Sequence, residues 1–246
     1  LLDTLAGLME GGKRLRPTFA YWGWRSAGGA PHGPILTAAA ALEFLQAGAL
    51  IHDDVMDGSD TRRGKPAAHR QLASMHRSHG YLGSSEDFGV GSAILLGDLC
   101  LTWSDELFMA SGLGSNALSA AKPLFDEMRT EVMAGQYLDL LEQVRGDYNL
   151  DNALLVARYK TAKYTVERPL QVGAAAAGAD RAHLHRLTAF GIPLGVAFQL
   201  RDDLLGVFGD PQQTGKPAGD DLREGKRTAL VALAWANADA VQQDLL

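Results

Sequence analysis

A long apolar segment that ends in a cluster of aspartates constrains this chain more than any other feature. Residues 38–52 read AAAALEFLQAGALIH, with no proline and with small residues on every side. This pattern predicts a helix that is buried or lines a cavity. Asp53, Asp54 and Asp57 follow it directly. Because a helix turns by about 100° per residue, Asp53 and Asp57 should lie one turn apart on the same face and repel each other.

A divalent cation would relieve this repulsion, which grows where an apolar environment excludes water. Carboxylate oxygens favour a hard ion such as Mg²⁺, which binds one or two carboxylates and completes its shell with substrate phosphates. The alternative is a solvated acidic helix end that binds nothing. Two adjacent arginines, Arg62 and Arg63, follow the aspartates.

A second apolar segment ends in the same way. Residues 190–200 read FGIPLGVAFQL, and Asp202 and Asp203 come just after them. Facing each other across a helical cavity, the two acidic helix ends could hold Mg²⁺ ions around a diphosphate. Lys216 and Lys226 would add cations that neutralise the charge on a leaving diphosphate. A dry aliphatic cavity would protect the resulting carbocation from water, so the pattern predicts ionisation of a carbon–oxygen bond to diphosphate.

A third motif is the glycine-rich turn GGKRLRP at residues 11–17, which carries Lys13, Arg14 and Arg16. Bare backbone amides beside three cations would suit an anion such as diphosphate. Basic residues near a turn are more often simply solvated, so this motif alone decides little.

The arrangement of these segments predicts an all-α fold. We expect one domain over residues 1–246, a bundle of about ten or more helices, because 246 residues that are 46% hydrophobic can bury a large core. No alternating strand pattern is found. The expected helices cover residues 1–10, 19–27, 34–52, 67–79, 90–112, 118–144, 150–178 with an interruption at Pro169, 181–210, and a last one from residue 227.

Composition excludes several classes of function. A net charge of −6 argues against a nucleic-acid partner. Cys100 is the one cysteine, so no internal disulfide can form and a reducing cytoplasm is expected. No apolar run of membrane-span length and no signal-peptide pattern are expected. Since the chain starts at Leu1, it is expected to be the ordered part of a longer polypeptide. No Ser/His/Asp set, Walker loop, GxGxxG or zinc spacing is found.

The motifs together resemble those of the trans-isoprenyl diphosphate synthases, or polyprenyl synthetases, from about residue 11 to 228. They are GGKRLRP, LIHDDVMDGSDTRRGKPAAH, GDLC, GQYLDL, YKTAKYT, FQLRDD and GKPAGDDLREGKRT, in the family's order. The resemblance implies helices around a central cavity, a homodimer, and Mg²⁺-dependent head-to-tail condensation of isopentenyl diphosphate with an allylic diphosphate, geranyl or farnesyl. It implies about three Mg²⁺ ions per active site.

The resemblance also implies roles for individual residues. Ligands of Mg²⁺ would be Asp53 and Asp57, with Asp54 supporting, and Asp202, with Asp203 and Asp221 nearby. The allylic diphosphate would be contacted by Arg62, Lys160, Lys216 and Lys226. Isopentenyl diphosphate would be held by Lys13, Arg16, Gln46 and Arg63, although many bacterial members have His at the position of Gln46. Thr161 and Gln199 would place dipoles near the carbocation, and the departing diphosphate could take the proton.

The chain departs from the family pattern at Gly206, because the second motif is commonly DDxxD and here reads DDLLG. One outer metal ligand is therefore missing, and Asp210 should lie too far away to replace it. The family's additional N-terminal helix and its C-terminal helices are also absent from this sequence, which again suggests that terminal segments of the polypeptide are missing from it.

Helix geometry suggests a product length. One turn rises about 5.4 Å, close to one extended isoprene unit, so Ala49, Leu45 and Ala41 would measure the tail from Asp53. Ala49 and its neighbour Gly48 are small, so we expect a C20 product, geranylgeranyl diphosphate, or a longer one. Leu45, Phe44 or a neighbouring helix would form the floor.

Two other functions stay open. A class I terpene cyclase also uses DDxxD, but it usually has a second Asn/Asp, Ser/Thr, Glu motif, which is not found, and it has no use for GGKRLRP. A non-catalytic subunit that modulates a synthase usually loses aspartates from the first motif, which is intact here. Gly206 alone points toward that alternative.

Overall fold

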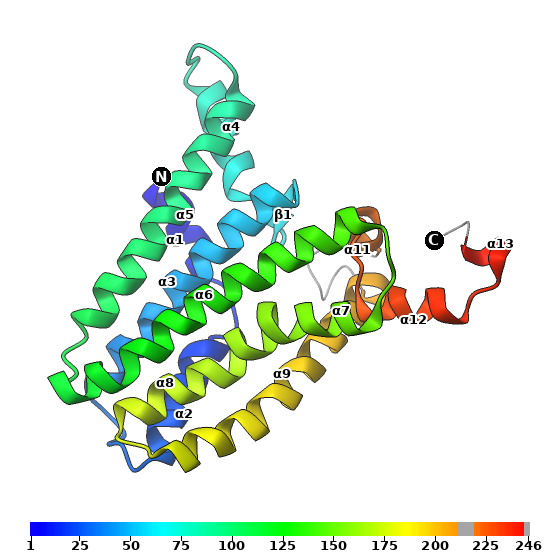
Figure 1. Ribbon diagram of the computed structural model, residues 1–246. Coiled ribbons are helices and arrows are strands. Elements are labelled where there is room, and N and C mark those ends of the chain that lie inside the picture. The colour runs from blue at the N-terminus through cyan, green and yellow to red at the C-terminus, as the bar shows by residue number, and fades with distance from the viewer. Residues whose placement is uncertain (211–218, 244–246) are drawn as a thin grey trace. The chain divides into compact units, whose positions relative to one another are not determined.

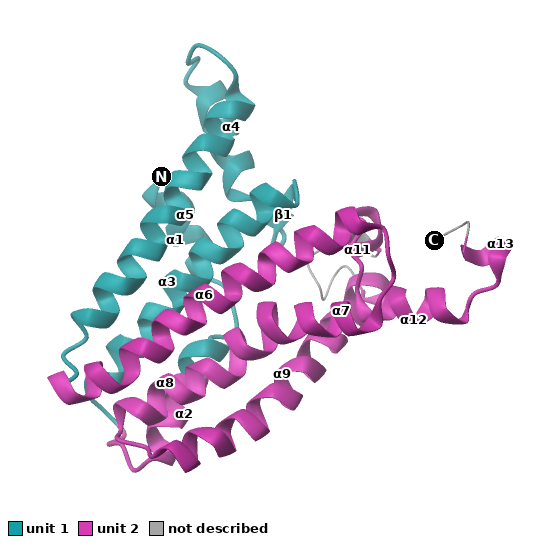
Figure 2. Ribbon diagram, viewed as in Figure 1, with its two compact units in different colours: residues 1–18, 32–113 teal, residues 19–31, 114–246 magenta. Residues whose placement is uncertain are grey.

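The computed structural model describes residues 1–210 and 219–243, and these residues are almost entirely helical (Figure 1). The chain divides into two compact units (Figure 2). Unit 1 comprises Leu1–Thr18 and His32–Leu113, and unit 2 comprises Phe19–Pro31 and Gly114–Leu246. The all-α prediction is confirmed. A single domain over residues 1–246, with its two aspartate motifs facing each other, stays a prediction.

Unit 1 is organised by the helix that leads to the first aspartates. Its helices are α1 (Leu2–Met9), α3 (Ile35–Met56), α4 (Ala68–Ser78) and α5 (Ser85–Met109). Helix α3 packs along α5, which also packs on α4. Gly48 permits a close approach, since a Cβ there would lie 3.0 Å from the carbonyl oxygen of Gly97 and 3.2 Å from the Cβ of Cys100. The predicted burial of this helix is confirmed on that side.

Helix α2 (Leu15–Ser26) begins in unit 1 and continues into unit 2. It starts one turn earlier than the expected residue 19. Pro17 lies in its first turn, where a missing backbone N–H costs nothing. The turn GGKRLRP therefore ends in helix, and its two arginines flank the helix start.

The two short strands found in the described part of the chain follow the first aspartates. Strand β1 (Thr61–Arg62) pairs antiparallel with β2 (Lys65–Pro66). The stretch between the expected helices at 34–52 and 67–79 therefore holds a short hairpin, which the sequence analysis did not predict. Arg63 and Gly64 join the strands at φ values of 55° and 73°, and a type I′ hairpin turn needs two such left-handed residues. The hairpin turns the side chain of Arg62 back toward α3.

Cys100 lies in the core of unit 1 with no exposed surface. The core side chains are Leu5, Ala47, Ile51, Ala68, Leu72, Ala93, Leu96 and Cys100. Burial raises the pKa of the Cys100 thiol to about 11.

We predict that the thiol of Cys100 is unreactive in the native chain. At pH 8 about a thousandth of it would be thiolate, and the packing blocks access to reagents. Titration with a chromogenic disulfide reagent should show no rapid release, and one equivalent after unfolding in guanidinium chloride. A fast equivalent without denaturant would contradict the packing of α5.

Unit 2 surrounds a central helical segment. Its elements are α6 (Ser115–Arg145), α7 (Leu150–Val156), η1 (Ala157–Glu167), α8 (Arg168–Ala176), α9 (Arg181–Phe208), α11 (Asp220–Arg223), α12 (Ala229–Asn237) and α13 (Ala240–Gln243). Segment η1 packs on both α6 and α9. The break expected at residues 146–149 is confirmed, because Gly146 ends α6 in the left-handed conformation and Asn149 caps α7 with its side-chain oxygen.

Segment η1 is a π-helix, which the sequence analysis did not foresee. The expected interruption at Pro169 is wrong, because α8 follows η1 directly and accommodates the proline in its first turn. Long π-helical stretches are rare and often mark functional sites. This one carries Lys160 and Thr161.

Glycines on the neighbouring helices admit the backbone of η1. A Cβ on Gly135 of α6 would lie 2.7 Å from the Cα of Lys160. A Cβ on Gly195 of α9 would lie 2.7 Å from the Cβ of Ala162. Both distances are too short for real side chains, so these glycines fix how closely η1 can be held from two sides.

Helix α3 is long and apolar enough, by length and composition alone, to cross a membrane, contrary to the expectation that no segment reaches this length. Half of the most apolar stretch of α3 is buried inside the structure, as in the core helix of a globular protein. A single such helix is weak support for a membrane span.

Candidate active site

The first acidic motif occupies the C-terminal end of α3. Asp57 is the C-cap residue, and its backbone N–H donates to the carbonyl oxygen of Asp53 at 2.8 Å, so the two aspartates are one turn apart as predicted. Negative charge is unfavourable here, because the last carbonyls of a helix already carry partial negative charge. The end of α3 therefore favours a positively charged partner.

Arg62 supplies part of that positive charge from β1. Its Nε donates to Oδ1 of Asp54 at 2.8 Å, and its Nη2 donates to Oδ2 of Asp53 at 3.3 Å. Burial alone would lower the pKa of Arg62, but the hydrogen bond and charge of Asp54, with Asp53 and Asp57 adding, raise it. Asp54 is almost completely buried and accepts a hydrogen bond from Arg62, and its supporting role at the metal stays a prediction.

Further guanidinium groups gather in unit 1. Burial lowers the pKa of Arg63, Glu43 opposes that shift, and the nearby charges of Arg14, Arg62 and Arg16 lower it further. A bound anion would relieve this repulsion between cations.

Two of these arginines are held in a strained backbone conformation. Arg14 and Arg63 have φ values of 52° and 55°, which cost non-glycine residues about 1 kcal/mol or more. Arg63 donates through Nη1 to the carbonyl oxygen of Leu8 at 2.8 Å. A Cβ on Gly12 would lie 2.8 Å from Nη2 of Arg63, so the glycine pair of GGKRLRP serves to seat this side chain.

A small hollow in unit 1 brings several predicted residues together. Its lining includes Gln46 and Arg63, which were predicted to hold isopentenyl diphosphate, and also Arg14 and Glu43, which pair with each other. Glu43 was not predicted as a site residue, and Arg14, one of the three cations of the GGKRLRP motif, was not among the residues expected to hold isopentenyl diphosphate. Lys13 is exposed and does not line this hollow.

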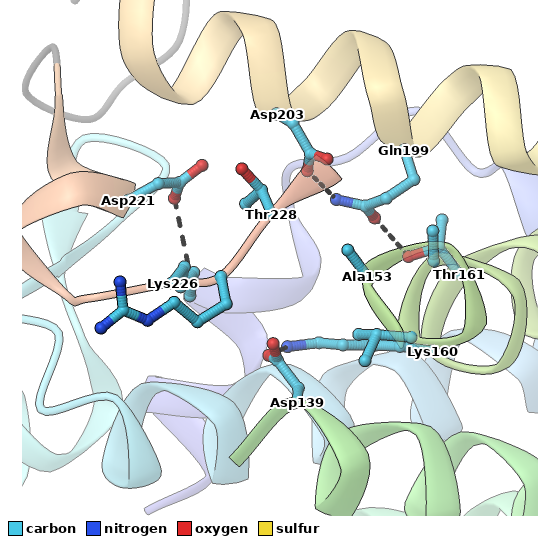
Figure 3. A pocket seen from close by; sticks show the side chains of 12 residues that line it. Asp139, Ala153, Lys160, Thr161, Gln199, Asp203, Asp221, Lys226 and Thr228 are labelled. Atoms are coloured by element: carbon cyan, nitrogen blue, oxygen red, sulfur yellow. Dashed lines mark hydrogen bonds and ion pairs between the residues drawn. The ribbon is translucent and has the colours of Figure 1, made fainter. Parts of the chain in front are cut away.

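Unit 2 contains a pocket with about 500 Å³ of empty space, part of which is open solvent. Several residues of the second predicted set line this pocket (Figure 3). Figure 3 shows acidic and basic side chains from η1, α9 and the segment before α12 directed into it. It is lined by Asp139, Ala153, Val156, Ala157, Lys160, Thr161, Gln199, Asp203, Asp221, Lys226, Arg227 and Thr228.

Hydrogen bonds fix the polar groups on one wall of this pocket. The hydroxyl of Thr161 donates to Oε1 of Gln199, whose Nε2 donates to Oδ1 of Asp203 at 2.7 Å. Opposite them, Nζ of Lys160 donates to Oδ2 of Asp139 at 2.6 Å (Figure 3). A hydroxyl, an amide, a carboxylate and an ammonium thus converge.

Asp203 is a buried acid of this pocket with a strongly raised pKa. Burial raises its pKa to about 6, the hydrogen bond from Gln199 opposes the shift, and the nearby charges of Asp221, Asp202 and Asp139 raise it further. Asp202 is exposed and does not line the pocket, so Asp203 takes the inward position. The assignment of Asp202 as the main metal ligand stays a prediction.

The segment between α11 and α12 brings Lys226 to the pocket. Aromatic contacts anchor it: the guanidinium of Arg227 lies 4.1 Å from the ring centroid of Tyr148, and Tyr148 stacks on Trp235 with centroids 3.9 Å apart. Lys226 Nζ lies 2.7 Å from Oε2 of Glu224. Lys216, the other predicted lysine, lies outside the described residues.

Comparison with known proteins decides the family. The model of the polyprenyl synthetase family matches residues 1–246. The chain belongs to the polyprenyl synthetase family. Its crystallised relatives include a geranylgeranyl pyrophosphate synthase from Corynebacterium glutamicum, complexed with isoprenyl diphosphate and magnesium, which has 48% sequence identity and a TM-score of 0.94 over 97% of this chain and 68% of that one.

Two curated relatives bear the names of synthases with different products. Geranylfarnesyl diphosphate synthase from Aeropyrum pernix is 34% identical over 94% of this chain and 70% of the relative. A (2E,6E)-farnesyl diphosphate synthase from Mycobacterium bovis is 34% identical over 92% of this chain and 57% of the relative. This polyprenyl synthetase chain therefore spans between 57% and 70% of the length of these relatives, and their names do not agree on product length.

The carboxylates of this polyprenyl synthetase fit a metal that arrives with a diphosphate. Among the described residues, no group of three His, Cys, Asp or Glu side chains is arranged to hold an ion by itself. Mg²⁺ needs no such cage, since one or two carboxylates and substrate phosphates suffice. The raised pKa of Asp203 beside other acids is a cost that a cation would remove.

Proposed function

We propose that this chain joins isopentenyl diphosphate head-to-tail to an allylic diphosphate in a Mg²⁺-dependent reaction. The observation that carries the proposal is the pocket of unit 2. There the buried Asp203 lies among acids, beside Lys160, Lys226 and the hydrogen-bonded pair of Thr161 and Gln199. Such a combination binds a metal–diphosphate and offers dipoles to a carbocation, which fits the family and its named relatives.

The residues would act on the leaving diphosphate and on the cation. Mg²⁺, held by Asp53 and Asp57 and by Asp202, Asp203 and Asp221, would neutralise charge on the diphosphate. Lys160 and Lys226 would contact its oxygens as that charge grows. No side chain is needed as a base, because the departing diphosphate can accept the proton that the isopentenyl unit loses when its new double bond forms.

Lys160 must exchange partners during this reaction. Its ammonium is paired with Asp139 in the structure. Because a diphosphate offers more negative charge than one carboxylate, the lysine would move from Asp139 to the substrate, and Asp139 would hold it in place between turnovers. The guanidinium cluster of Arg14, Arg16 and Arg63 would bind isopentenyl diphosphate, with Gln46 beside it.

Release of diphosphate tests the proposal against its alternatives. The chain would be incubated with Mg²⁺ and farnesyl diphosphate, with and without isopentenyl diphosphate, and released diphosphate measured by a coupled pyrophosphatase assay. We expect release with both substrates and little with farnesyl diphosphate alone. Release from the allylic substrate alone, with a hydrocarbon product, would indicate a cyclase. No release in either mixture would indicate a non-catalytic subunit.

The proposed product is geranylgeranyl diphosphate, with Ala49 on α3 leaving room for the tail. Ala49 is partly exposed, and Leu45, one turn away, is buried. Gly48 packs closely against α5, and this contact already explains why the residue is small. Gly48 therefore supports the proposed product length less strongly than Ala49 does.

We predict that Ala49→Phe shortens the product by about one isoprene unit, because a ring there would fill about one helix turn of space. Dephosphorylated products would be sized by chromatography. The control is Leu36→Phe on the same helix, since Leu36 is 52% exposed. An unchanged distribution in Ala49→Phe would contradict this path for the tail.

The remaining expectations follow from the family and stay predictions. They are about three Mg²⁺ ions per active site, a homodimer, and a cytoplasmic location.

A further inference from the structure

Unit 2 contains a second group of charged side chains, largely buried, that the proposed reaction does not use. Its centre is Glu131 on α6, whose side chain is 12% exposed. Oε1 of Glu131 accepts hydrogen bonds from Nζ of Lys163 and from Nη2 of Arg168, and its Oε2 accepts one from Nε of Arg168 at 2.7 Å. Burial would raise the pKa of Glu131, but the hydrogen bonds and charges of Arg168 and Lys163 lower it. One ionised carboxylate therefore binds cations from both η1 and the start of α8.

Stability alone does not explain why this group is kept. Taking charges out of water costs free energy that their mutual attraction often only just offsets, and apolar side chains of similar volume can be as stabilising. The two nitrogens of Arg168 that meet the two oxygens of Glu131 form a bidentate pair, which fixes direction as well as distance. The group therefore fixes the position of η1 and α8 on α6.

Helix α6 contacts η1 at three evenly spaced positions. Glu131, Gly135 and Asp139 follow one another at intervals of four residues and so share one face of α6. Glu131 binds Lys163, and Asp139 binds the ammonium of Lys160. Between these two acids, the backbone of Lys160 lies against Gly135. Two lysines of η1 are thus held by acids about two turns apart on α6.

The proposed reaction would break one of these contacts. Lys160 lines the pocket and would leave Asp139 for the diphosphate of the substrate. Lys163 and Arg168 do not line the pocket, so their pairs with Glu131 would stay intact during the reaction. Glu131 would then be the acid of α6 that still holds η1 while Lys160 contacts the substrate.

We propose that Glu131 is a positioning residue for Lys160, acting through Lys163 and Arg168 without touching the substrate. The inference rests on the proposed function, because it takes Lys160 to contact the diphosphate. It assigns the charges on this face of α6 to the control of where the ammonium of Lys160 meets its ligand.

The sign of one effect separates this role from simple electrostatics. Glu131→Gln removes a negative charge from unit 2, and by Coulomb attraction alone this should strengthen the binding of an anion. If Glu131 positions Lys160, the same substitution should weaken the binding of diphosphate, because η1 is no longer fixed on α6.

Both cations keep an acid nearby when Glu131 is neutralised. Nη2 of Arg168 lies 2.7 Å from Oε1 of Glu127, and Nζ of Lys163 lies 3.8 Å from Oε2 of Glu167. Because Glu167 belongs to η1 itself, Lys163 would retain a charge partner without being held on α6. We therefore expect Glu131→Gln to fold.

The experiment measures the binding of inorganic diphosphate with Mg²⁺ to the whole chain by isothermal titration calorimetry. We expect Glu131→Gln to weaken binding about tenfold and Lys160→Ala about thirtyfold. The double variant should bind within about twofold of Lys160→Ala, because Glu131 acts only through the lysine that is already lost. The control is Glu127→Gln, which removes another partner of Arg168 on the same helix. Its side chain is 53% exposed, so binding should change by less than about twofold.

Thermal unfolding followed by circular dichroism would establish that each variant is folded at the assay temperature. If Glu131→Gln does not fold, Lys163→Met replaces it in the same cycle with Lys160→Ala, and the same loss without additivity is expected. The proposal is overturned if Glu131→Gln binds diphosphate as tightly as the unsubstituted chain or more tightly, or if the two losses multiply in the double variant.

Prenyl transfer by the unsubstituted chain would be measured separately. The expected binding pattern without any transfer would reject the proposed condensation and leave the positioning role of Glu131 standing. Transfer together with losses that multiply would reject the positioning role alone.

Discussion

Replacing Asp53 with alanine is expected to slow prenyl transfer by about a thousandfold or more while the chain stays folded. Asp53 lies at the C-terminal end of α3, where a negative charge opposes the helix dipole. Its guanidinium partner, Arg62, keeps Asp54 when Asp53 is lost. The substitution therefore removes a metal ligand at little structural cost. Initial rates of elongation and the thermal unfolding temperature would be measured together.

Asp60→Ala provides the matched control for this prediction. Asp60 lies on the same segment, its side chain is 76% exposed, and it pairs with Arg70 at 2.8 Å. Exposed pairs contribute about 0–1 kcal/mol to stability, so both rate and unfolding temperature should be nearly unchanged. A near-normal rate in Asp53→Ala, at an unfolding temperature equal to that of the control, would refute the assigned role.

Gly135→Ala is expected to destabilise unit 2 by about 2–3 kcal/mol and to slow turnover with it. A Cβ on Gly135 would lie 2.7 Å from the Cα of Lys160, which is backbone and can yield only if η1 moves away from α6. Such a movement would also separate Lys160 from Asp139, because their 2.6 Å contact joins the same two elements. Urea unfolding and elongation rates would report the two effects.

The control for this prediction is a glycine in another helix with open space around it. Gly91→Ala in α5 meets nothing within 4 Å and should stabilise the chain by about 0.5–1 kcal/mol, as alanine does at an unstrained helical position. If Gly135→Ala were as stable as Gly91→Ala, the close approach of η1 to α6 would be disproved.

Long apolar periodicity and helix breakers predicted most of the fold. Gly146 and Asn149 marked the end of α6 and the start of α7, and the structure has both. The π-helix could not be predicted, because it differs from an α-helix by one residue per hydrogen-bonded turn and leaves no period of its own in a short sequence. Its position depends on glycines from α6 and α9, which are distant in the chain.

Residue type and spacing predicted which acids and cations would carry the chemistry, but not which of them pair. The structure joins Lys160 to Asp139 across 21 positions and Arg14 to Glu43 across 29, and spacing along one helix cannot reveal such contacts. The same limit applies to Gly206. In the sequence it breaks the DDxxD pattern, and in the structure the carboxylate of Asp221 lies beside it.

The most direct test of the central claim is the mass of the product formed from farnesyl diphosphate and labelled isopentenyl diphosphate with Mg²⁺. The proposal predicts a labelled product one isoprene unit longer than the primer, geranylgeranyl diphosphate, and no product when EDTA removes the metal. A chain that is folded and binds diphosphate, yet returns the primer unchanged with every allylic diphosphate supplied, would contradict it.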